Sequence, residues 1–465
     1  PGTIDNLPGT IDNLPGTIDN LPGTIGNLPG TYMGSVTIIT RPNNPSGELI
    51  SMQSLTEIIE VAQQNNGWVF LDEAYIEFSE QPSVAKTLLD RFDNLVVLRT
   101  LSKAYGLAGI RLGYLLGSEM LIAEFEKRCA PFNIAQPTLK IAAKALAPDN
   151  QAEMLNFCQQ IITNRNRLFN WLTTNNIPVI SSQANFLVLP LPKKQAVAIE
   201  SFLAKNGFLI RTFDNEELSN CLRITIPYQI DRLQLLLQQA LKPDLICLDM
   251  DGVLIDTSGS YDATVIATVK QLSDKDISLA DINQLKQSGG YNNDWVVTQK
   301  LLQNLGITMQ LDVVTEAFQQ LYLGDNIDGN NNGLVKNETA IINASLISII
   351  KQSTSTNFSI VTGRPLTEAK AGQHLIDLNE LDLISLDCVK QSKPSPEGII
   401  RLQEKYSALS WMCGDNPDDM QAAIASNSMA IGIGSKEKAA SLYQAGADIV
   451  LNNINELEDW LCPLK

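Results

Sequence analysis

The sequence predicts an α/β protein with parallel sheets that carry polar residues at the ends of their strands. Short apolar runs such as 245–248 alternate with amphipathic stretches such as 51–64, which is the pattern of a parallel sheet covered by helices. Each run stops at polar or charged residues, so these side chains should gather at the carboxyl edge of the sheet, where open α/β sheets bind ligands. With 465 residues, the chain has room for roughly two to four domains.

The composition argues against several classes of function. The net charge of −17 disfavours a nucleic-acid or anionic-membrane partner, because phosphate backbones are bound through Lys and Arg. No apolar stretch reaches the roughly 18 residues of a membrane-spanning helix. The seven cysteines include no Cys-x-x-Cys pair, which favours a reducing compartment, and we therefore expect a cytoplasmic protein.

The single histidine, His374, restricts the chemistry further. Ser-His-Asp and Cys-His mechanisms and histidine-rich zinc sites have almost no histidine to use. Reactions must therefore depend on carboxylates, Lys, Arg, Tyr or a cofactor, and an all-oxygen site favours Mg²⁺ over zinc. We expect His374 to have a surface or packing role.

Residues 1–34 are expected to form a low-complexity tail. Residues 1–28 are four copies of Pro-Gly-Thr-Ile-Asp-Asn-Leu, with Gly26 in place of Asp in the fourth copy. The proline in every copy excludes a coiled coil, because it would break each helical turn. A disordered or loosely extended tail is favoured over an ordered solenoid. The chain begins at Pro1 rather than Met, so we expect a fragment.

Residues 35–130 are expected to form part of a cofactor-binding domain. The segments 36–40, 68–71 and 95–98 have the pattern of short strands. The polar residues that follow them include Asn44, Asp72, Tyr75, Ser102, Lys103 and Arg111. A lysine near an aspartate, with a serine and an arginine available for a phosphate, suits pyridoxal phosphate. The lysine amine forms a Schiff base with this cofactor, and the aspartate keeps the pyridine nitrogen protonated.

Three motifs of this region resemble those of fold-type I aminotransferases, most of all the histidinol-phosphate aminotransferase family. They are Asn43-Asn44-Pro45-Ser46-Gly47, Asp72-Glu73-Ala74-Tyr75 and Ser102-Lys103-Ala104-Tyr105-Gly106, the last of which continues to Arg111. The resemblance covers roughly residues 36–242. It implies that Lys103 is the Schiff-base lysine and that Asp72 pairs with the pyridinium nitrogen. It also implies that Asn44 and Tyr75 bond the phenolic oxygen of the cofactor, whereas Ser102 and Arg111 bind its phosphate.

Residues 131–242 fit the smaller domain of the same family. We expect a helix at 152–173 and strands at 177–180 and 185–189. Arg211 and Arg223 match the family's arginines for the substrate anion, although two structural arginines on strands are the alternative.

Before its first motif the family has a long segment, and here only the repeats precede residue 35. The large domain is therefore expected to be incomplete. Such a region would bind the cofactor weakly or not at all unless a partner chain supplies the rest.

Residues 243–465 are expected to form a second domain, organised around Asp249-Met250-Asp251-Gly252. Asp249 ends the apolar run 245–248, so it should lie at the carboxyl edge of a sheet with Asp251 facing the same pocket. Later strand patterns lead to Thr362, Lys393, Asp415, Asp418 and Asp419. Helical spacing without any strand pattern, at 260–270, 278–287, 295–305 and 311–323, predicts a helical cap at about 258–340.

These side chains suit cleavage of a phosphate ester. Asp249 would attack the phosphorus and become phosphorylated, and Asp251 would protonate the leaving oxygen and then activate water. Thr362 would hydrogen-bond the phosphoryl oxygens, and Lys393 would neutralise their charge. Mg²⁺ would be held by Asp249, Asp415 and either Asp419 or Asp418, with the backbone carbonyl of Asp251 as a further ligand.

The four motifs, in this order, resemble the haloacid dehalogenase superfamily over roughly residues 244–465. An acid at Asp251 implies a phosphatase or phosphomutase, because dehalogenases lack an acid there and P-type pumps have Thr. The position of the cap between the first two motifs is similar to that in the subgroup of phosphoglycolate phosphatase and β-phosphoglucomutase. The whole chain is thus expected to be a partial aminotransferase fold followed by a Rossmann-like domain with a helical cap.

Three functions follow from this organisation. The favoured one is a Mg²⁺-dependent phosphatase of a small phosphorylated metabolite, fused to a truncated aminotransferase region. The second is a bifunctional aminotransferase and phosphatase of histidine biosynthesis. In the third, the aminotransferase-like region is only a scaffold that forms a homodimer. A phosphomutase would be distinguished by its dependence on a bisphosphate activator.

Overall fold

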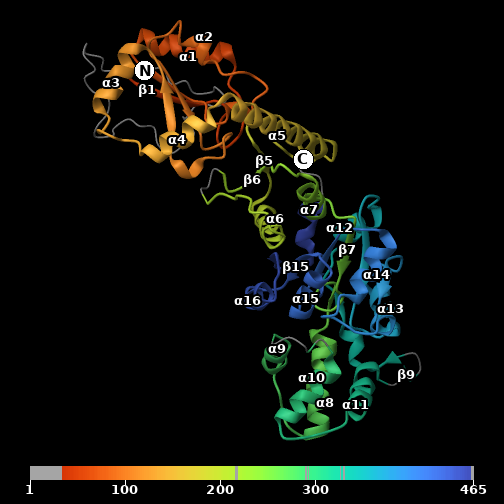
Figure 1. Ribbon diagram of the computed structural model, residues 1–465. Coiled ribbons are helices and arrows are strands. Elements are labelled where there is room, and N and C mark those ends of the chain that lie inside the picture. Colours follow the sequence, from red (N-terminus) through yellow and green to blue (C-terminus); the bar gives the residue numbers. More distant parts are fainter. Residues whose placement is uncertain are drawn as a thin grey trace. The chain divides into compact units, whose positions relative to one another are not determined.

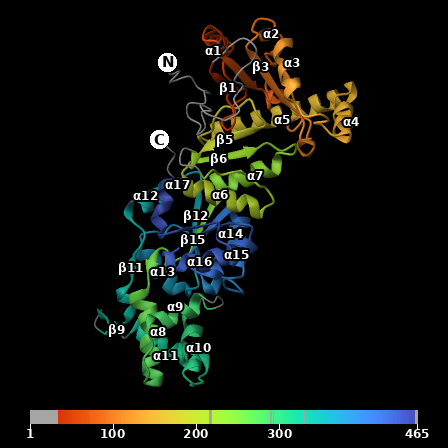
Figure 2. The same cartoon turned by 90° about the vertical axis from the view of Figure 1, so that its left-hand side faces the viewer.

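A computed structural model describes residues 34–214, 218–287, 291, 293–324, 326–327 and 330–461. The repeat tail predicted for residues 1–34 lies outside this range apart from Gly34. The chain divides into two compact units, each with its own α/β core (Figures 1 and 2). The first unit is Pro1–Pro192 with Ile210–Asp231, and the second is Lys193–Leu209 with Arg232–Lys465. Within the described residues, no helix is both long and apolar enough to span a membrane.

A four-stranded sheet forms the centre of the first unit. Its order is β1-β2-β3-β4, in which β1 to β3 are parallel and β4 is antiparallel to β3. The strands are β1 (Val36–Thr40), β2 (Trp68–Asp72), β3 (Leu95–Thr100) and β4 (Gly113–Leu116). Helix α1 (Met52–Gln64) packs Leu55 and Ile59 against Val69 and Leu71 of the sheet, as its apolar spacing predicts. The three predicted strands and the first helix are therefore confirmed within one to two residues.

The rest of the first unit consists of helices and a two-stranded sheet. These elements are α2 (Ala85–Leu88), α3 (Glu119–Arg128), α4 (Gln136–Ala145), α5 (Pro148–Thr174), β5 (Phe186–Pro190) and β6 (Cys221–Thr225). Arg165 anchors α5, because its buried guanidinium donates to the carbonyl oxygens of Phe78 (2.8 Å) and Ala184 (3.2 Å). The strand predicted at 177–180 is wrong: Ile180 makes an isolated bridge to Val188, and one paired residue does not make a strand.

The second unit has a six-stranded, fully parallel sheet of order β13-β12-β7-β14-β15-β16. Its strands are β7 (Leu245–Leu248), β12 (Asn357–Val361), β13 (Asp382–Ile384), β14 (Ser410–Gly414), β15 (Met429–Ile433) and β16 (Ile449–Leu451). The helices beside them are α12 (Ala344–Gln352), α13 (Leu366–Leu375), α14 (Glu397–Tyr406), α15 (Pro417–Ala425), α16 (Lys436–Gln444) and α17 (Glu458–Leu461). Since β7 lies between β12 and β14, all four of its residues are buried, which explains its unbroken apolar sequence.

A helical insertion between β7 and β12 forms the cap. It contains α8 (Ala263–Ser273), α9 (Leu279–Gln287), α10 (Asp294–Asn304) and α11 (Leu311–Leu323), and α8, α10 and α11 lie side by side (Figures 1 and 2). The short strands β8 (Ile255–Asp256) and β11 (Thr339–Ala340) pair where the chain enters and leaves the cap. Within the described residues no strand interrupts the four predicted helices, and the short strands β9 (Asn326–Ile327) and β10 (Asn330–Asn331) pair after the last of them. Two-residue strands are too short for an alternating pattern to reveal them.

Two helices that precede residue 243 also belong to the second unit. Lys205 of α6 (Lys193–Lys205) forms an ion pair with the buried Asp448, with Nζ and Oδ1 2.6 Å apart. In α7 (Asp231–Leu241), Gln239 donates to the carbonyl oxygens of Ser410 (3.0 Å) and Asn427 (2.7 Å). Its own carbonyl accepts a hydrogen bond from the indole of Trp411 (2.6 Å). Both helices therefore pack on the sheet of the second unit.

Replacing Gln239 with Ala is expected to lower the free energy of unfolding of the second unit by roughly 2–4 kcal/mol. The change leaves the buried carbonyl of Ser410 and the partly buried carbonyl of Asn427 without this donor; such a loss costs about 1–3 kcal/mol for a buried group and less for one that water can reach. Chemical denaturation followed by circular dichroism measures the effect. Gln238→Ala on the same helix is the control and should cost much less, because Gln238 is only partly buried. Equal effects of the two substitutions would contradict the packing described for α7.

Candidate active site

Asp249 lies directly after the central strand β7, at the carboxyl edge of the sheet. Its backbone N–H donates to the carbonyl of Cys413 (2.9 Å), which continues the ladder between β7 and β14, and its side chain is buried. The chain then turns at Gly252, where φ is +71°. A Cβ at this position would lie 2.2 Å from Oδ2 of Asp415, so glycine is required here by both the backbone conformation and the close approach.

Three carboxylates meet at this edge. One oxygen each of Asp249, Asp415 and Asp419 lies within 4.8 Å of the others. Asp415 follows β14, and Asp419 lies in the first turn of α15, where its Oδ2 accepts the backbone N–H of Asn416 (3.1 Å). The structure thus places Asp419 in this group, which does not include Asp418.

Lys393 bridges two of the three carboxylates. Its Nζ lies 2.7 Å from Oδ1 of Asp249 and 2.6 Å from Oδ1 of Asp419, and it also donates to the carbonyl of Val361 (3.0 Å). Thr362 follows Val361 at the end of β12, and its backbone N–H donates to the carbonyl of Ile384 (2.9 Å). The lysine and the threonine therefore reach the same sheet edge as Asp249, as the sequence predicts.

The electrostatics of this group favour a bound cation. Burial raises the pKa of Asp249 well above its usual value, and the charge of Asp419 raises it further, whereas Lys393 opposes the rise. Burial also raises the pKa of Asp419. Burial alone would lower the pKa of Lys393, but the charges of Asp249 and Asp419 bring it above its usual value. Lys393, together with Lys438, whose Nζ lies 2.8 Å from Oδ2 of Asp415, balances only two of the three carboxylates, so a divalent cation would lower the cost of keeping all three ionised.

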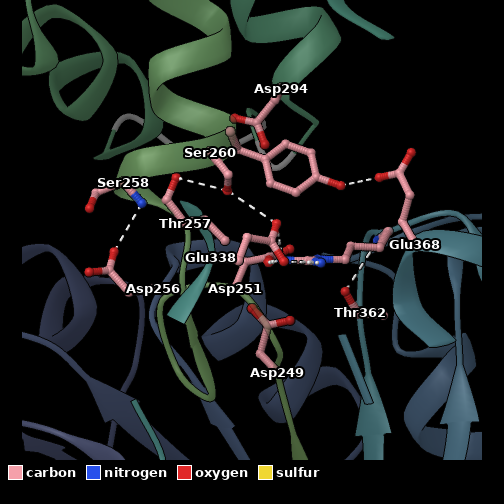
Figure 3. Close-up of polar contacts among 12 residues, drawn as sticks. Asp249, Asp251, Asp256, Thr257, Ser258, Ser260, Asp294, Glu338, Thr362 and Glu368 are labelled. Atoms are coloured by element: carbon pink, nitrogen blue, oxygen red, sulfur yellow. Dashed lines mark hydrogen bonds and ion pairs between the residues drawn. The ribbon is translucent and has the colours of Figure 1, made fainter. Parts of the chain in front are cut away.

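Asp251 belongs to a second polar group: it lies beside Glu338 (Figure 3), and Arg364 is hydrogen-bonded to both carboxylates. Arg364 donates to Oδ1 of Asp251 through Nε (2.8 Å) and through one terminal nitrogen (2.6 Å). It also donates to both carboxylate oxygens of Glu338, each at 3.0 Å. Arg364 and Glu338 were not among the predicted site residues. The position of Arg364, two residues after Thr362 in the same strand-end motif, was the signal that could have revealed it.

The cap supplies further side chains to the site. A cavity of about 270 Å³ is lined by Asp249, Asp251 and Asp415 from the core and by Lys286 and Asp294 from the cap. Lys286 forms ion pairs with Asp294 (2.8 Å) and Asp262 (2.9 Å), and the charges of these two carboxylates raise the pKa of Lys286 although its burial opposes the rise. Lys438 of α16, which sequence reasoning also missed, contacts Oδ2 of Asp415 at 2.8 Å.

In the first unit, several of the predicted cofactor residues lie near the ring of Phe186. The guanidinium of Arg223 lies over this ring at 5.0 Å and donates to Oδ1 of Asn44 (2.9 Å). The ring of Tyr75 packs edge-on against Phe186 at 5.3 Å, and Nζ of Lys103 lies 5.0 Å from the centre of the Tyr75 ring. The structure therefore brings Asn44, Tyr75, Lys103 and Arg223 together.

The other predicted residues of this unit lie around that group. Burial raises the pKa of Asp72, while the backbone N–H of Ala74 and the charge of Lys103 oppose the rise. Ser102 accepts a hydrogen bond from the hydroxyl of Thr100 (2.9 Å), and Arg111 is exposed. Arg211 pairs through its backbone with Arg223, and its guanidinium lies over Phe213.

Comparison with known proteins finds two families in succession. The profile of aminotransferase class I and II matches residues 17–236, and that of haloacid dehalogenase-like hydrolase matches residues 243–427. Among curated proteins, histidinol-phosphate aminotransferase 1 of Legionella pneumophila (strain Lens) is 35% identical over 194 residues, which cover 41% of this chain and 52% of that protein. Histidinol-phosphate aminotransferase of Yersinia enterocolitica is 39% identical over 191 residues, covering 40% of this chain and 50% of that protein.

The chain spans about half the length of these curated relatives. Among solved structures, a hydrolase from Pseudomonas syringae is 20% identical, with a TM-score of 0.37. This similarity covers 46% of this chain and 96% of that one.

Proposed function

Because the chain joins a region of the aminotransferase class I and II family to a haloacid dehalogenase-like hydrolase region, we propose that the second region is a Mg²⁺-dependent phosphatase of a small phosphate ester. The observation that supports this most is the group of Asp249, Asp415 and Asp419 bridged by Lys393 at the end of a parallel sheet. We propose 243–465 as the bounds of this region, with its cap at about 258–340.

The residues present fit a magnesium ion. Carboxylate oxygens are the ligands that Mg²⁺ prefers, and the three carboxylates exceed the charge that Lys393 and Lys438 can balance. Asp249, Asp415 and Asp419 would hold the ion, and the backbone carbonyl of Asp251 is a further candidate ligand. When bound, Mg²⁺ supplies positive charge that stabilises the transferring phosphoryl group.

The first chemical step is phosphoryl transfer to Asp249. A carboxylate oxygen of Asp249 attacks the phosphorus in line with the ester bond, which breaks as the aspartyl phosphate forms. Asp251 gives its proton to the leaving oxygen, so an alcohol departs. Thr362 donates to a phosphoryl oxygen, and the ammonium of Lys393 balances the negative charge on the group. Water is kept from the reacting atoms by the cap, which lines the cavity with Lys286 and Asp294.

The second step releases phosphate and restores the enzyme. Asp251, now a carboxylate, takes a proton from water as the water oxygen attacks the phosphorus. The bond between the phosphorus and the Asp249 oxygen breaks, so inorganic phosphate leaves and Asp249 is a carboxylate again. A panel of phosphate esters, with inorganic phosphate release measured in the presence of Mg²⁺, tests this function. Turnover of no ester in the panel would reject it.

A second candidate function is a bifunctional enzyme, which the succession of the two families favours. The curated relatives of the first region are named histidinol-phosphate aminotransferases, and the product of such an enzyme is itself a phosphate ester. We propose histidinol phosphate as the first ester to test. If the two regions serve one pathway, it should be hydrolysed faster than other small alkyl phosphates; if it is hydrolysed no faster, the pairing loses its support.

The first region is proposed to bind pyridoxal phosphate, with Lys103 and Asp72 near its ring and Asn44 and Tyr75 beside its oxygen. The amine, carboxylate, amide and phenol in this group fit that cofactor chemically. When bound, the cofactor supplies a ring that accepts electrons from a substrate amine. Ser102 and Arg111 would bind its phosphate, and Arg211 and Arg223 would bind an anionic group of the substrate. A homodimer through this region and a cytoplasmic location stay predictions.

Adding pyridoxal phosphate to the full chain is expected to produce the visible absorbance band of a cofactor bound through a lysine amine. Lys103→Ala should abolish this band, because the variant lacks the amine that bonds the cofactor. Lys86→Ala, at an exposed lysine of the same unit, is the control and should keep the band. A band that persists in Lys103→Ala, or its absence from the wild type, would leave the region as a scaffold.

A further inference from the structure

Arg364 is a buried cation whose hydrogen bonds are divided between the core and the cap. Its side chain is 2% exposed. On one side it donates two hydrogen bonds to Oδ1 of Asp251, at 2.8 and 2.6 Å. On the other side it donates one hydrogen bond to each carboxylate oxygen of Glu338, both at 3.0 Å (Figure 3). A planar guanidinium with a fixed fork of donors can make both contacts only in one orientation.

Glu338 is fixed in turn by residues of the cap. Its Oε1 accepts hydrogen bonds from the hydroxyl groups of Tyr322 (2.8 Å) and Ser260 (3.1 Å). It directly precedes β11, which pairs with β8 where the chain leaves and enters the cap. The ring of Tyr261 lies 5.0 Å from the guanidinium of Arg364 and closes this face of the group. The contacts of Arg364 with Glu338 therefore tie it to the chain segments that carry the cap.

Asp251 is held at one oxygen and is still open to the cavity. Both donors of Arg364 reach Oδ1, and the side chain of Asp251 is 34% exposed. The Asp251 side chain borders a pocket that is also lined by Asp249, Tyr261 and Arg364. The direction of the Asp251 carboxylate thus depends on the position of Arg364, and through Glu338 on the position of the cap connections.

We propose that Arg364 is a positioning residue for the hydrolase reaction. It orients the Asp251 carboxylate toward the leaving-group oxygen and, through Glu338, couples this orientation to the position of the cap. This inference rests on the proposed phosphatase function. Arg364 acts through Asp251 and needs no contact with substrate. Because an acid or base displaced by about 1 Å can cost on the order of 100-fold in rate, this restraint affects catalysis directly.

The test compares two esters of similar size, phenyl phosphate and p-nitrophenyl phosphate. Phenolate is the poorer leaving group and depends more on protonation by Asp251, whereas p-nitrophenolate departs with less help. We expect Arg364→Ala to lower kcat/KM for phenyl phosphate on the order of 100-fold and to lower it clearly less for p-nitrophenyl phosphate. Asp251→Asn should show the same dependence on the leaving group. In an Asp251→Asn background, Arg364→Ala should add little further loss, because the two residues act as one unit.

Further variants separate positioning from folding. Arg364→Lys keeps a positive charge and most of the side chain, and it should show a smaller loss with the same leaving-group dependence. Low concentrations of guanidinium chloride should restore part of the activity of Arg364→Ala but none of that of Asp251→Asn. Arg401→Ala, at an exposed arginine of α14, should retain wild-type kinetics.

The outcomes distinguish this inference from the function on which it rests. Two results would overturn the positioning role alone, provided that the wild type turns over the esters. In the first, Arg364→Ala lowers kcat/KM equally for both esters. In the second, its loss of kcat/KM adds fully to that of Asp251→Asn. If the wild type hydrolyses no ester of the panel in the presence of Mg²⁺, these two included, the phosphatase function is rejected, and this role with it.

Discussion

Asp249→Asn is expected to lower phosphatase turnover on the order of 10⁴-fold or more, which is the largest effect predicted for this chain. The substitution keeps the size of the side chain and removes the oxygen nucleophile that would form the bond to phosphorus. It also removes one charge from the group of Asp249, Asp415 and Asp419. The measurement is steady-state release of phosphate at saturating Mg²⁺ from the best ester of the panel.

A matched control separates loss of the nucleophile from general damage to the fold. Asp274 ends α8 in the left-handed conformation with a φ of +52°, which Asn adopts about as readily as Asp. Asp274→Asn should therefore keep wild-type turnover and thermal stability. Turnover by Asp249→Asn within about tenfold of the wild type would mean that this carboxylate forms no covalent intermediate.

The second large effect concerns the magnesium ion. We expect Asp415→Asn and Asp419→Asn to weaken Mg²⁺ binding roughly 100-fold or more, because each change would remove a charged oxygen from the proposed ligands, and loss of even an outer partner of a metal site costs about 10–100-fold. Isothermal titration calorimetry with Mg²⁺ measures this directly, without any substrate. Chelation by EDTA should correspondingly abolish turnover, and added Mg²⁺ should restore it.

Asp418→Asn decides between the two candidate acids of α15. Asp418 is buried on the same helix but lies outside the group of three carboxylates, so this variant should bind Mg²⁺ as the wild type does. If Asp418→Asn weakened binding and Asp419→Asn did not, the ligand set described here would be wrong.

The strands and their polar ends could be predicted from the sequence because a buried parallel strand is a short apolar run that stops where the sheet stops. Asp249, Thr362 and Asp415 were placed at strand ends that the structure brings to one edge. Which of the neighbouring acids Asp418 and Asp419 joins the group could not be decided, because both lie in the first turn of one helix. That choice depends on how α15 is rotated against the sheet.

The residues that the sequence did not reveal act through partners far along the chain. Arg364 reaches Asp251 across 113 positions and Glu338 across 26, and no periodic pattern marks such a pair. Nothing in the sequence around Lys438 distinguishes it from other helical lysines, and only the fold places it beside Asp415. Similarly, the sequence does not indicate which sheet α6 and α7 cover. The pairing of Lys205 with Asp448 decides this for α6, and it is visible only in three dimensions.

Asp249 is proposed to accept the phosphoryl group, and trapping of the reaction intermediate examines this step itself. A single turnover with a phosphate ester radiolabelled at phosphorus, quenched in acid and followed by peptide mapping, would locate the label. We predict an acid-stable, hydroxylamine-sensitive label on the peptide that contains Asp249, formed by the wild type and absent from Asp249→Asn. Phosphate release by the wild type with no labelled protein, or with the label on another residue, would contradict the account.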